Sequence, residues 1–339
     1  MSITQKDIAK KLKISKATVS RALLNDPKIN IKTRKKVHET AKKLNYYPNL
    51  VAKSLRMKRT NFIGVIVSDI SNPFFPEVIE GIATEANREK FHIIFGNTKY
   101  NVEIETDYIE FFISHKVEGV IVATAISNRS LKILEANKIP FVLVDIKPIE
   151  KNKVNTIYFN QEEGGYIATK HLLSLGHSKI ALINGPEEIS SSKFFKKGYL
   201  KALKEFNINV KPSYIKEEKI NMTIIGGFKK VEGFLALKED EIPTAFMFIS
   251  DMAALGGYRA INKYGYKIPN DFSIIGNDDI FFAKDFMPPL TTISYKNYKL
   301  GEESFKILLD IIENKNTYKP TQYKLPPKLV IRESTTKLS

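Results

Sequence analysis

The chain has 339 residues, enough for two or three domains, and its 43% hydrophobic content is typical of a globular protein. It has no cysteine, which excludes a disulfide framework and thiolate metal sites. The formal charge of +16 is uneven, because residues 1–60 hold 17 Lys/Arg and 3 Asp/Glu, a net charge of +14. We call residues 1–60 the head and residues 61–339 the body. A strongly basic head joined to a nearly neutral body indicates that the head contacts a polyanion and that the body has a different function.

The N-terminus does not match a signal peptide, because charged residues between Lys6 and Lys13 interrupt any apolar run. No stretch approaches the roughly 18 consecutive apolar residues of a membrane helix, so we expect a cytoplasmic protein. Five histidines without an HExxH spacing predict no catalytic metal site, and nothing in the sequence indicates a cofactor.

Three short helices are predicted in the head. Thr4 followed by Asp7 is typical of a helix N-cap with an acidic residue in the first turn. Ser15 is expected to cap a second helix over residues 16–24, which Asn25-Asp26-Pro27 ends. A third helix is expected over about 32–44, and the three apolar faces together predict a small core.

The second helix leaves short, polar or basic side chains outside near its N-terminal end, where a recognition helix meets base edges and phosphates: Lys16, Ala17, Thr18, Ser20 and Arg21. The Arg21 guanidinium suits guanine, whereas the hydroxyls of Ser15, Thr18 and Ser20 suit phosphate oxygens. The alternative is a solvated face of a helical bundle, which the charge of the head disfavours.

Asn49 can cap a short basic segment over residues 50–58, after Tyr46-Tyr47-Pro48 ends the third helix. A helix of about two turns does not persist alone in water, so we expect it to fold on docking. Leu55 is then an apolar wedge suited to insertion into a minor groove. The alternative is an ordinary interdomain linker.

The body alternates apolar runs with amphipathic stretches. Strands are expected at 62–68, 92–97, 119–124, 141–145, 179–185, 244–250, 272–278 and 291–295. Helices are expected at 76–90, 106–116, 130–138, 162–176, 192–206 and 252–265. The repeated units predict an α/β body with two doubly wound parallel sheets, whose ligand lies at the carboxyl ends of strands in a cleft between two lobes.

The body lacks the sequence marks of an enzyme. The first strand is followed by SDISNPFF and not by a glycine-rich phosphate loop, and no nucleophile elbow or Ser/His/Asp set is present. We therefore expect no enzymatic activity.

Side chains at strand ends are the candidates for the ligand site: Asn72, Phe74, Phe75, Asp145, Asp251 and Asp278. Carboxylates bind hydroxyl or amine groups, and aromatic rings stack on flat or pyranose faces. The alternatives are a turn for Asp278 and core packing for Phe74 and Phe75.

The segments DIAKKLKISKATVSRALLN, TRKKVHETAKKLNYYPNLVAKSLR and FIGVIVSDISNPFF resemble the LacI/GalR family of bacterial transcriptional repressors, and the resemblance runs essentially from end to end. It implies a helix-turn-helix domain over 1–48, a hinge helix and linker over 49–60, and a periplasmic-binding-protein-like effector and dimerisation domain over 61–339. Lobe one is expected at about 61–160 and 292–323, with segment 301–315 returning to it. Lobe two is expected at about 161–291 and 324–339.

The resemblance also assigns residues. It implies that Lys16, Ala17 and Arg21 read bases, that Leu55 opens the central step of a palindromic operator, and that Phe74, Asp145 and Asp278 contact a ligand. The full expected DNA-contacting set is Thr4, Ser15, Lys16, Ala17, Thr18, Ser20, Arg21, Asn25, Asn30, Thr33, Asn49 and Leu55. The full expected effector set is Asn72, Phe74, Phe75, Asp145, Ser191, Phe195, Met247, Asp251 and Asp278.

Three positions depart from the pattern of sugar-binding members. Phe195 and Ile146 stand where such proteins have arginines, and Tyr295 stands where many members have glutamine. The loss of bidentate guanidinium groups favours a ligand that is less polar or more aromatic than a simple sugar, or no small ligand at all.

The prediction is a dimeric repressor whose affinity for operator DNA is set by a sugar or other metabolite in the cleft, with a tetramer left open. A regulator of the same fold that answers to a partner protein is one alternative. A small-molecule carrier is another, although a carrier needs no basic head and would be expected to have an export signal.

Overall fold

The computed structural model describes residues 3–47, 59–123, 126–146, 154–217, 223–314 and 319–338. The chain divides into two compact units, Met1–Thr60 and Asn61–Ser339, here called the head and the body. Asn49 and Leu55, predicted to lie on a hinge helix, fall outside the described residues. Within the described ranges, no helix has both the length and the apolar character needed to cross a membrane.

The head contains the three predicted helices, α1 (Gln5–Leu12), α2 (Lys16–Leu23) and α3 (Ile31–Lys43). The Asp7 carboxylate accepts hydrogen bonds from Thr4 N at 2.8 Å and Thr4 Oγ1 at 2.7 Å, so it fixes the start of α1. Ser15 Oγ accepts from Thr18 N at 3.0 Å and caps α2. The predicted bounds of α2 and α3 therefore hold to within one residue.

The core of the head is small. Its buried side chains are Ile8, Ala9, Val19, Ala22, Val37 and Ala41. Leu23 of α2 is half-buried at the margin of this core, whereas Ala22 is fully buried within it. Because this core uses so few side chains, most of each helix surface faces solvent.

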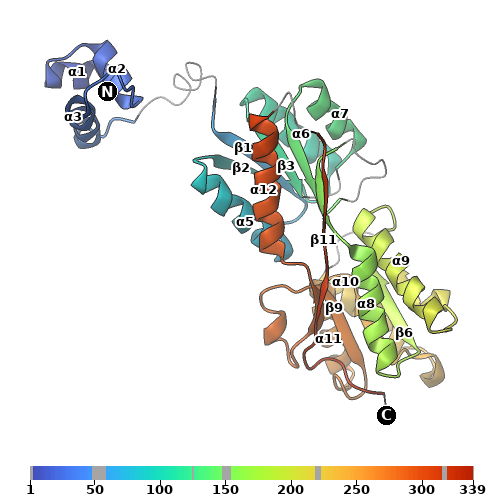
Figure 1. The fold of residues 1–339 in the computed structure, drawn as a ribbon. Helices are drawn as coiled ribbons and strands as arrows, with labels where there is room; N and C mark the ends of the chain where they lie inside the picture. Colours follow the sequence, from blue (N-terminus) through green and yellow to red (C-terminus); the bar gives the residue numbers. More distant parts are fainter. Residues whose placement is uncertain are drawn as a thin grey trace. The chain divides into compact units, whose positions relative to one another are not determined.

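Lobe one of the body contains a parallel sheet in the order β11-β5-β4-β3-β1-β2; Figure 1 labels β1, β2, β3 and β11 of this sheet. Its strands are β1 (Phe62–Val67), β2 (His92–Asn97), β3 (Gly119–Ala123), β4 (Phe141–Val144), β5 (Thr156–Phe159) and β11 (Gln322–Leu325). Its helices are α5 (Phe74–Arg88), α6 (Val102–Ser114), α7 (Asn128–Ala136) and α12 (Asn297–Glu313). Every residue of β3 is buried, as expected for a central strand covered on both faces.

Lobe two repeats this plan in the order β12-β10-β9-β8-β6-β7, with β12 antiparallel to β10. Its strands are β6 (Ile180–Asn184), β7 (Ile215–Glu217), β8 (Ala245–Phe248), β9 (Ser273–Asp278), β10 (Thr291–Ser294) and β12 (Lys328–Val330). Its helices are α8 (Gln161–Ser174), α9 (Ser190–Glu205), α10 (Ile224–Leu235) and α11 (Asp251–Lys263), with short 3₁₀ turns η1 (Pro212–Tyr214), η2 (Glu239–Glu241) and η3 (Ala283–Asp285). The predicted two-sheet α/β architecture is confirmed.

Three described connections join the lobes, from β5 to α8, from β10 to α12 and from β11 to β12. The expected lobe boundaries at about 292 and 324 need correction by a few residues. Residues 292–294 pair with β9 in the sheet of lobe two, whereas residues 324–325 pair with β5 in lobe one. As expected, α12 returns to lobe one, where it packs against α5 (Figure 1).

Three strands escaped prediction: β5, β7 and β11. Each has only three or four residues, and β7 and β11 lie at sheet edges with partly exposed polar side chains. An edge strand buries little surface, so its sequence need not form a continuous apolar run.

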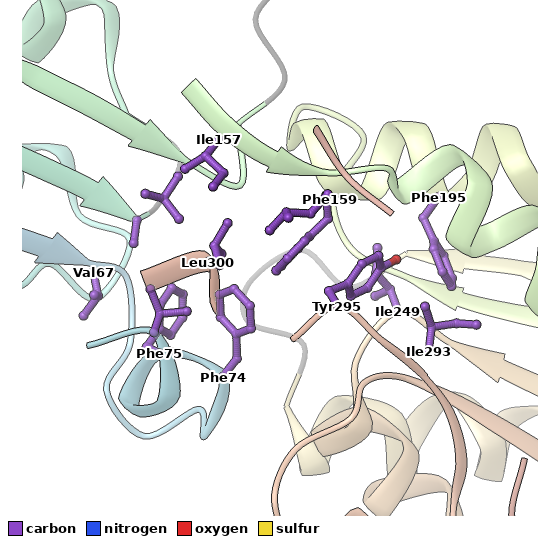
Figure 2. Close-up of a cluster of buried hydrophobic side chains, with 14 of the residues drawn as sticks. Val67, Phe74, Phe75, Ile157, Phe159, Phe195, Ile249, Ile293, Tyr295 and Leu300 are labelled. Carbon is purple, nitrogen blue, oxygen red and sulfur yellow. The ribbon is translucent and has the colours of Figure 1, made fainter. Parts of the chain in front are cut away.

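One hydrophobic cluster extends through both lobes where they meet (Figure 2). Phe74 from α5, Phe159 from β5 and Tyr295 after β10 lie in a row, with ring centroids 6.1 Å apart for Phe74 and Phe159 and 4.3 Å apart for Phe159 and Tyr295. The lobes are therefore joined by packed aromatic side chains as well as by the chain itself.

Candidate functional site

The exposed face of α2 is the first candidate site. Lys16, Ala17 and Arg21 are exposed on it, close to the capped N-terminus of the helix. Thr18 and Ser20 are half-buried, and Ser15 and Thr18 share a hydrogen bond of 2.9 Å between their hydroxyl groups. The structure thus groups the predicted base-reading side chains on one helix end, while Ser15 and Thr18 also hold that end in shape.

The remaining predicted head residues lie at helix ends. Thr4 is exposed at the start of α1, Asn30 caps α3 by accepting from Lys32 N at 2.8 Å, and Thr33 is half-buried in the first turn of α3. These positions present backbone N–H groups and short polar side chains, which suit phosphate oxygens.

Asn25 is held in place by two residues that sequence reasoning missed. It has a positive φ of 57°, its side-chain oxygen lies 3.1 Å from His38 Nε2, and its carbonyl oxygen accepts from Arg34 Nη1 at 3.1 Å. Asparagine tolerates this backbone conformation better than most residues do. The Asn25-Asp26-Pro27 break indicated the turn, but the partners on α3 come from the tertiary fold.

A cavity of about 750 Å³ between the two lobes of the body is the second candidate site. Its lining comes from the ends of β1, β2, β3, β4, β6, β8 and β9 or the segments that follow them, from α7, and from the start of α8. These strands contribute their carboxyl ends, as predicted for an open α/β sheet.

Six of the predicted effector residues line this cavity: Asn72, Phe74, Phe75, Asp145, Ser191 and Asp278. Asn72 Oδ1 accepts from Phe74 N at 3.1 Å and so fixes the start of α5. The rings of Phe74 and Phe75 meet edge to face at 5.0 Å and form an apolar wall.

Phe195 and Met247 do not line the cavity, which corrects the expectation for both. Phe195 lies one turn deeper along α9 than Ser191 and is fully buried in the hydrophobic cluster, with its backbone closely apposed to Gly165 of α8. Met247 is fully buried inside β8, where its sulfur lies 3.3 Å from Thr169 Oγ1. The lining side chains come from one turn earlier on α9 and from beyond the end of β8.

Asp251 is also outside the cavity lining. It is fully buried at the start of α11, where Oδ1 accepts from Thr292 Oγ1 at 2.6 Å and Oδ2 accepts from Ile280 N at 3.0 Å. Its carboxylate is thus occupied in joining three segments of lobe two, which is a structural role.

Sequence reasoning missed Tyr100, Gln161 and Asn277, all of which line the cavity. Tyr100 follows β2 and Asn277 lies at the end of β9, so the strand-end rule could have found them. Gln161 begins α8 directly after β5, and it was missed because β5 itself was not predicted.

Tyr295 supports the cavity wall from beneath. Its buried hydroxyl lies 2.8 Å from Gln161 Oε1 and 3.0 Å from Asn277 Oδ1. Gly164 makes room for it, because a Cβ at that position would collide with the Tyr295 hydroxyl. The tyrosine that departs from the family pattern therefore positions two polar lining residues.

Burial governs the electrostatics of the cavity. It raises the pKa of the Asp145 carboxyl to about 7, against hydrogen bonds from Gln161 and the Phe159 backbone that lower it. Burial, together with the negative charges of Asp251, Asp145 and Glu77, raises the pKa of Asp278 well above its usual range. Oδ1 of Asp145 is buried without a hydrogen-bond partner.

No group of three or more metal-ligating side chains occurs in the parts of the chain that the structure describes.

Two family models match this chain. One, described as periplasmic binding proteins and sugar binding domain of LacI family, matches residues 60–333. The other, described as bacterial regulatory proteins, lacI family, matches residues 4–49. Together they cover both the head and the body.

Individual relatives agree. The HTH-type transcriptional repressor PurR of Aliivibrio fischeri strain MJ11 is 32% identical over 333 residues, which are 98% of each chain. The lac repressor dimer bound to operator and the anti-inducer ONPF matches with a TM-score of 0.87 at 28% identity, over 99% of this chain and 100% of that one. A regulator from Enterococcus faecium with bound ribose matches with a TM-score of 0.72 at 31% identity, over 82% of this chain and 100% of that one.

Proposed function

Because the chain belongs to the LacI family of bacterial regulatory proteins, we propose that it is a transcriptional repressor that binds a palindromic DNA operator as a dimer. The observation that carries this proposal is the capped N-terminal end of α2, where Lys16, Ala17 and Arg21 are exposed together in a head with a net charge of +14. A helix-turn-helix of this kind presents that helix end to base edges in the major groove.

The body supplies the control. A small molecule in the cavity touches both lobes, so a ligand that favours one arrangement of the lobes shifts the equilibrium between DNA-bound and free states. The solved relatives support this part, since one holds operator and an anti-inducer and another holds ribose.

The division of labour follows from the same proposal. Residues 1–48 bind DNA, residues 49–60 with Asn49 and Leu55 form the hinge, and residues 61–339 bind the effector and dimerise. The protein acts in the cytoplasm and catalyses no reaction, in keeping with relatives that are named as repressors.

Selection from randomised double-stranded DNA tests the proposal. The full chain should enrich one two-fold symmetric sequence and bind it about 10³-fold or more tightly than scrambled DNA of the same composition. Two chains should bind each site, as light scattering of the complex can show. Enrichment of no sequence, or one chain on an asymmetric site, would contradict it.

A further inference from the structure

The two lobes each contribute one carboxyl group to the cavity wall. Asp145 follows β4 in lobe one, and Asp278 ends β9 in lobe two. Both residues have a positive φ, 58° for Asp145 and 119° for Asp278. Residues other than glycine rarely adopt this backbone conformation. The negative charge of Asp145 contributes to the raised pKa of Asp278, so the two carboxyl groups lie close enough to repel one another.

One of these carboxyl groups lacks a hydrogen-bond donor. Oδ1 of Asp145 is buried and has no hydrogen-bond partner in the structure. Buried acceptors in folded proteins are nearly always paired, so the lining is short of a donor at this atom. A molecule bound in the cavity can supply it when the Asp145 side chain rotates, because the atom itself has almost no accessible surface in the unliganded chain.

The charge of the lining is also one-sided. Glu135, Glu187 and Glu188 line the cavity in addition to the two aspartates, whereas Lys193 is the single cationic side chain among the described residues of the lining. Ile146 and Phe195 stand where sugar-binding relatives would offer a guanidinium group. Glu187 is paired with Lys196 at 3.1 Å, whereas Asp145 and Asp278 have no ion-pair partner among the described residues. This lining disfavours an anion and leaves the charge of the two aspartates uncompensated.

We propose that the effector carries a protonated amine, which binds between Asp145 and Asp278 and donates a hydrogen bond to Asp145 Oδ1. Phe74 and Phe75 then pack against the apolar part of the same molecule. Because the amine attracts one carboxylate from each lobe, its binding links the lobes, which is the differential interaction that control of the repressor requires. This inference rests on the proposed function of the cavity.

The test is a thermal shift screen of the full chain. The library contains amine metabolites such as glucosamine and putrescine, each paired with a neutral isostere in which the amine is a hydroxyl, here glucose and butanediol. At about pH 7, where the amines are largely protonated, the melting temperature should rise with at least one amine and not with its isostere. A neutral compound that raises it as much as its amine, or a library in which no amine raises it, would overturn the proposal.

Charge-removing variants locate the site. Asp145→Asn and Asp278→Asn should each weaken binding of the active amine at least tenfold, because each loses one carboxylate charge. Asp107→Asn on α6 and Asp285→Asn in η3 remove exposed charges outside the cavity lining and should bind it normally. Equal binding by all four variants would place the amine elsewhere.

Proton counting on the unmodified chain gives a readout that does not depend on folding of the variants. A bound cation lowers the raised pKa values of Asp145 and Asp278, so titration calorimetry near pH 7 in two buffers should detect proton release. Asp251 and Glu77 also face these carboxyl groups and contribute to the proton total, whereas Tyr100 and Tyr295, whose pKa values are raised, stay protonated near pH 7. No proton release on amine binding would overturn the proposal, whereas failure of the chain to bind operator both with and without the active amine would count against the proposed function alone.

Discussion

The head and the body place their functional side chains in opposite environments. In the head, a core of six buried side chains leaves Lys16, Ala17 and Arg21 exposed, so the charges of Lys16 and Arg21, which we propose to contact DNA, act through water and salt. In the body, the carboxyl groups of Asp145 and Asp278 lie in a largely desolvated cavity, where charge interactions are stronger and less screened. We therefore expect the head to attract DNA over long range through its exposed charges, and the cavity to select its ligand through short-range contacts.

Removal of residues 1–60 is the most severe test of this comparison, and we expect it to abolish operator binding. With about 6–10 phosphate contacts, the full chain should lose roughly 10³–10⁵-fold in affinity between low and physiological salt. Filter binding over a salt series measures both quantities. If the truncated body keeps its affinity and salt dependence, the head is not the DNA-binding element.

Leu55→Ala tests the hinge that we propose to connect the two regions. Loss of a buried leucine side chain should cost about 1.5–3 kcal/mol on operator and much less on random DNA, because only the operator complex buries it. Equal losses on both DNAs would make residues 49–60 a plain linker. Hydrogen-exchange protection of residues 49–57 in the free protein would contradict folding on docking.

Arg21→Ala tests whether the exposed face of α2 reads sequence. It should cost about 1–3 kcal/mol and relax base preference at one operator position. Thr18→Ala should weaken all sequences more evenly, since a phosphate contact carries no base identity. Selection from a randomised site with each variant checks both results, and an unchanged preference for Arg21→Ala would exclude the assignment.

Asp145→Asn tests the desolvated side of the comparison. The pKa of Asp145 is raised from 3.8 to about 7 in the folded chain, so the wild type loses stability as pH rises through this range. The uncharged variant does not, and its melting temperature should exceed that of the wild type by roughly 8–16 °C at high pH and by almost nothing near pH 4. His171 and His177, whose pKa values are lowered by burial, titrate equally in both proteins and cancel. A pH-independent difference would mean that Asp145 does not titrate in this way.

Tyr295→Phe should give the smallest effect. It removes the hydroxyl shared by Gln161 and Asn277 and should cost about 0.5–1.5 kcal/mol of stability, while the ring stack on Phe159 remains. Ligand affinity should fall because two lining side chains lose their orientation, and operator affinity without ligand should not change. Calorimetry and filter binding separate these outcomes, and an unchanged ligand affinity would remove Tyr295 from the site.

Sequence patterns predicted those parts of the molecule that local chemistry determines. The helix caps at Thr4 and Ser15 and the buried strands β1 and β3 depend on neighbours in sequence, so their patterns are strong. By contrast, Asp251 and Asp278 both stand at the end of an apolar strand, so their sequence patterns are alike. Only the tertiary fold determines that Asp251 accepts hydrogen bonds from Thr292 and Ile280 N, whereas Asp278 lines the cavity. A rule based on strand ends cannot distinguish these two aspartates.

The same limit applies to Phe195. Its place in the family pattern suggested a ligand contact, but α9 turns it into the hydrophobic cluster, one helical turn below Ser191. A family pattern predicts which helix carries a residue, but the packing of that helix determines whether the side chain faces the cavity or the hydrophobic cluster.

The discontinuous build of lobe one has a consequence for its synthesis on the ribosome. Its first strands and α5 leave the ribosome early. Helix α12 and the edge strand β11 are translated only after all of α8 to α11. Yet α12 packs so closely on α5 that Gly81 and Gly301 leave no room for a side chain. Until α12 and β11 have been translated, the side of α5 that packs on α12 and the outer edge of β5 lack their partners, although α5 can already pack on β2 and β5 can already pair with β4. Synthesis of lobe one thus begins first and ends late, so part of its interior stays uncovered while lobe two is translated.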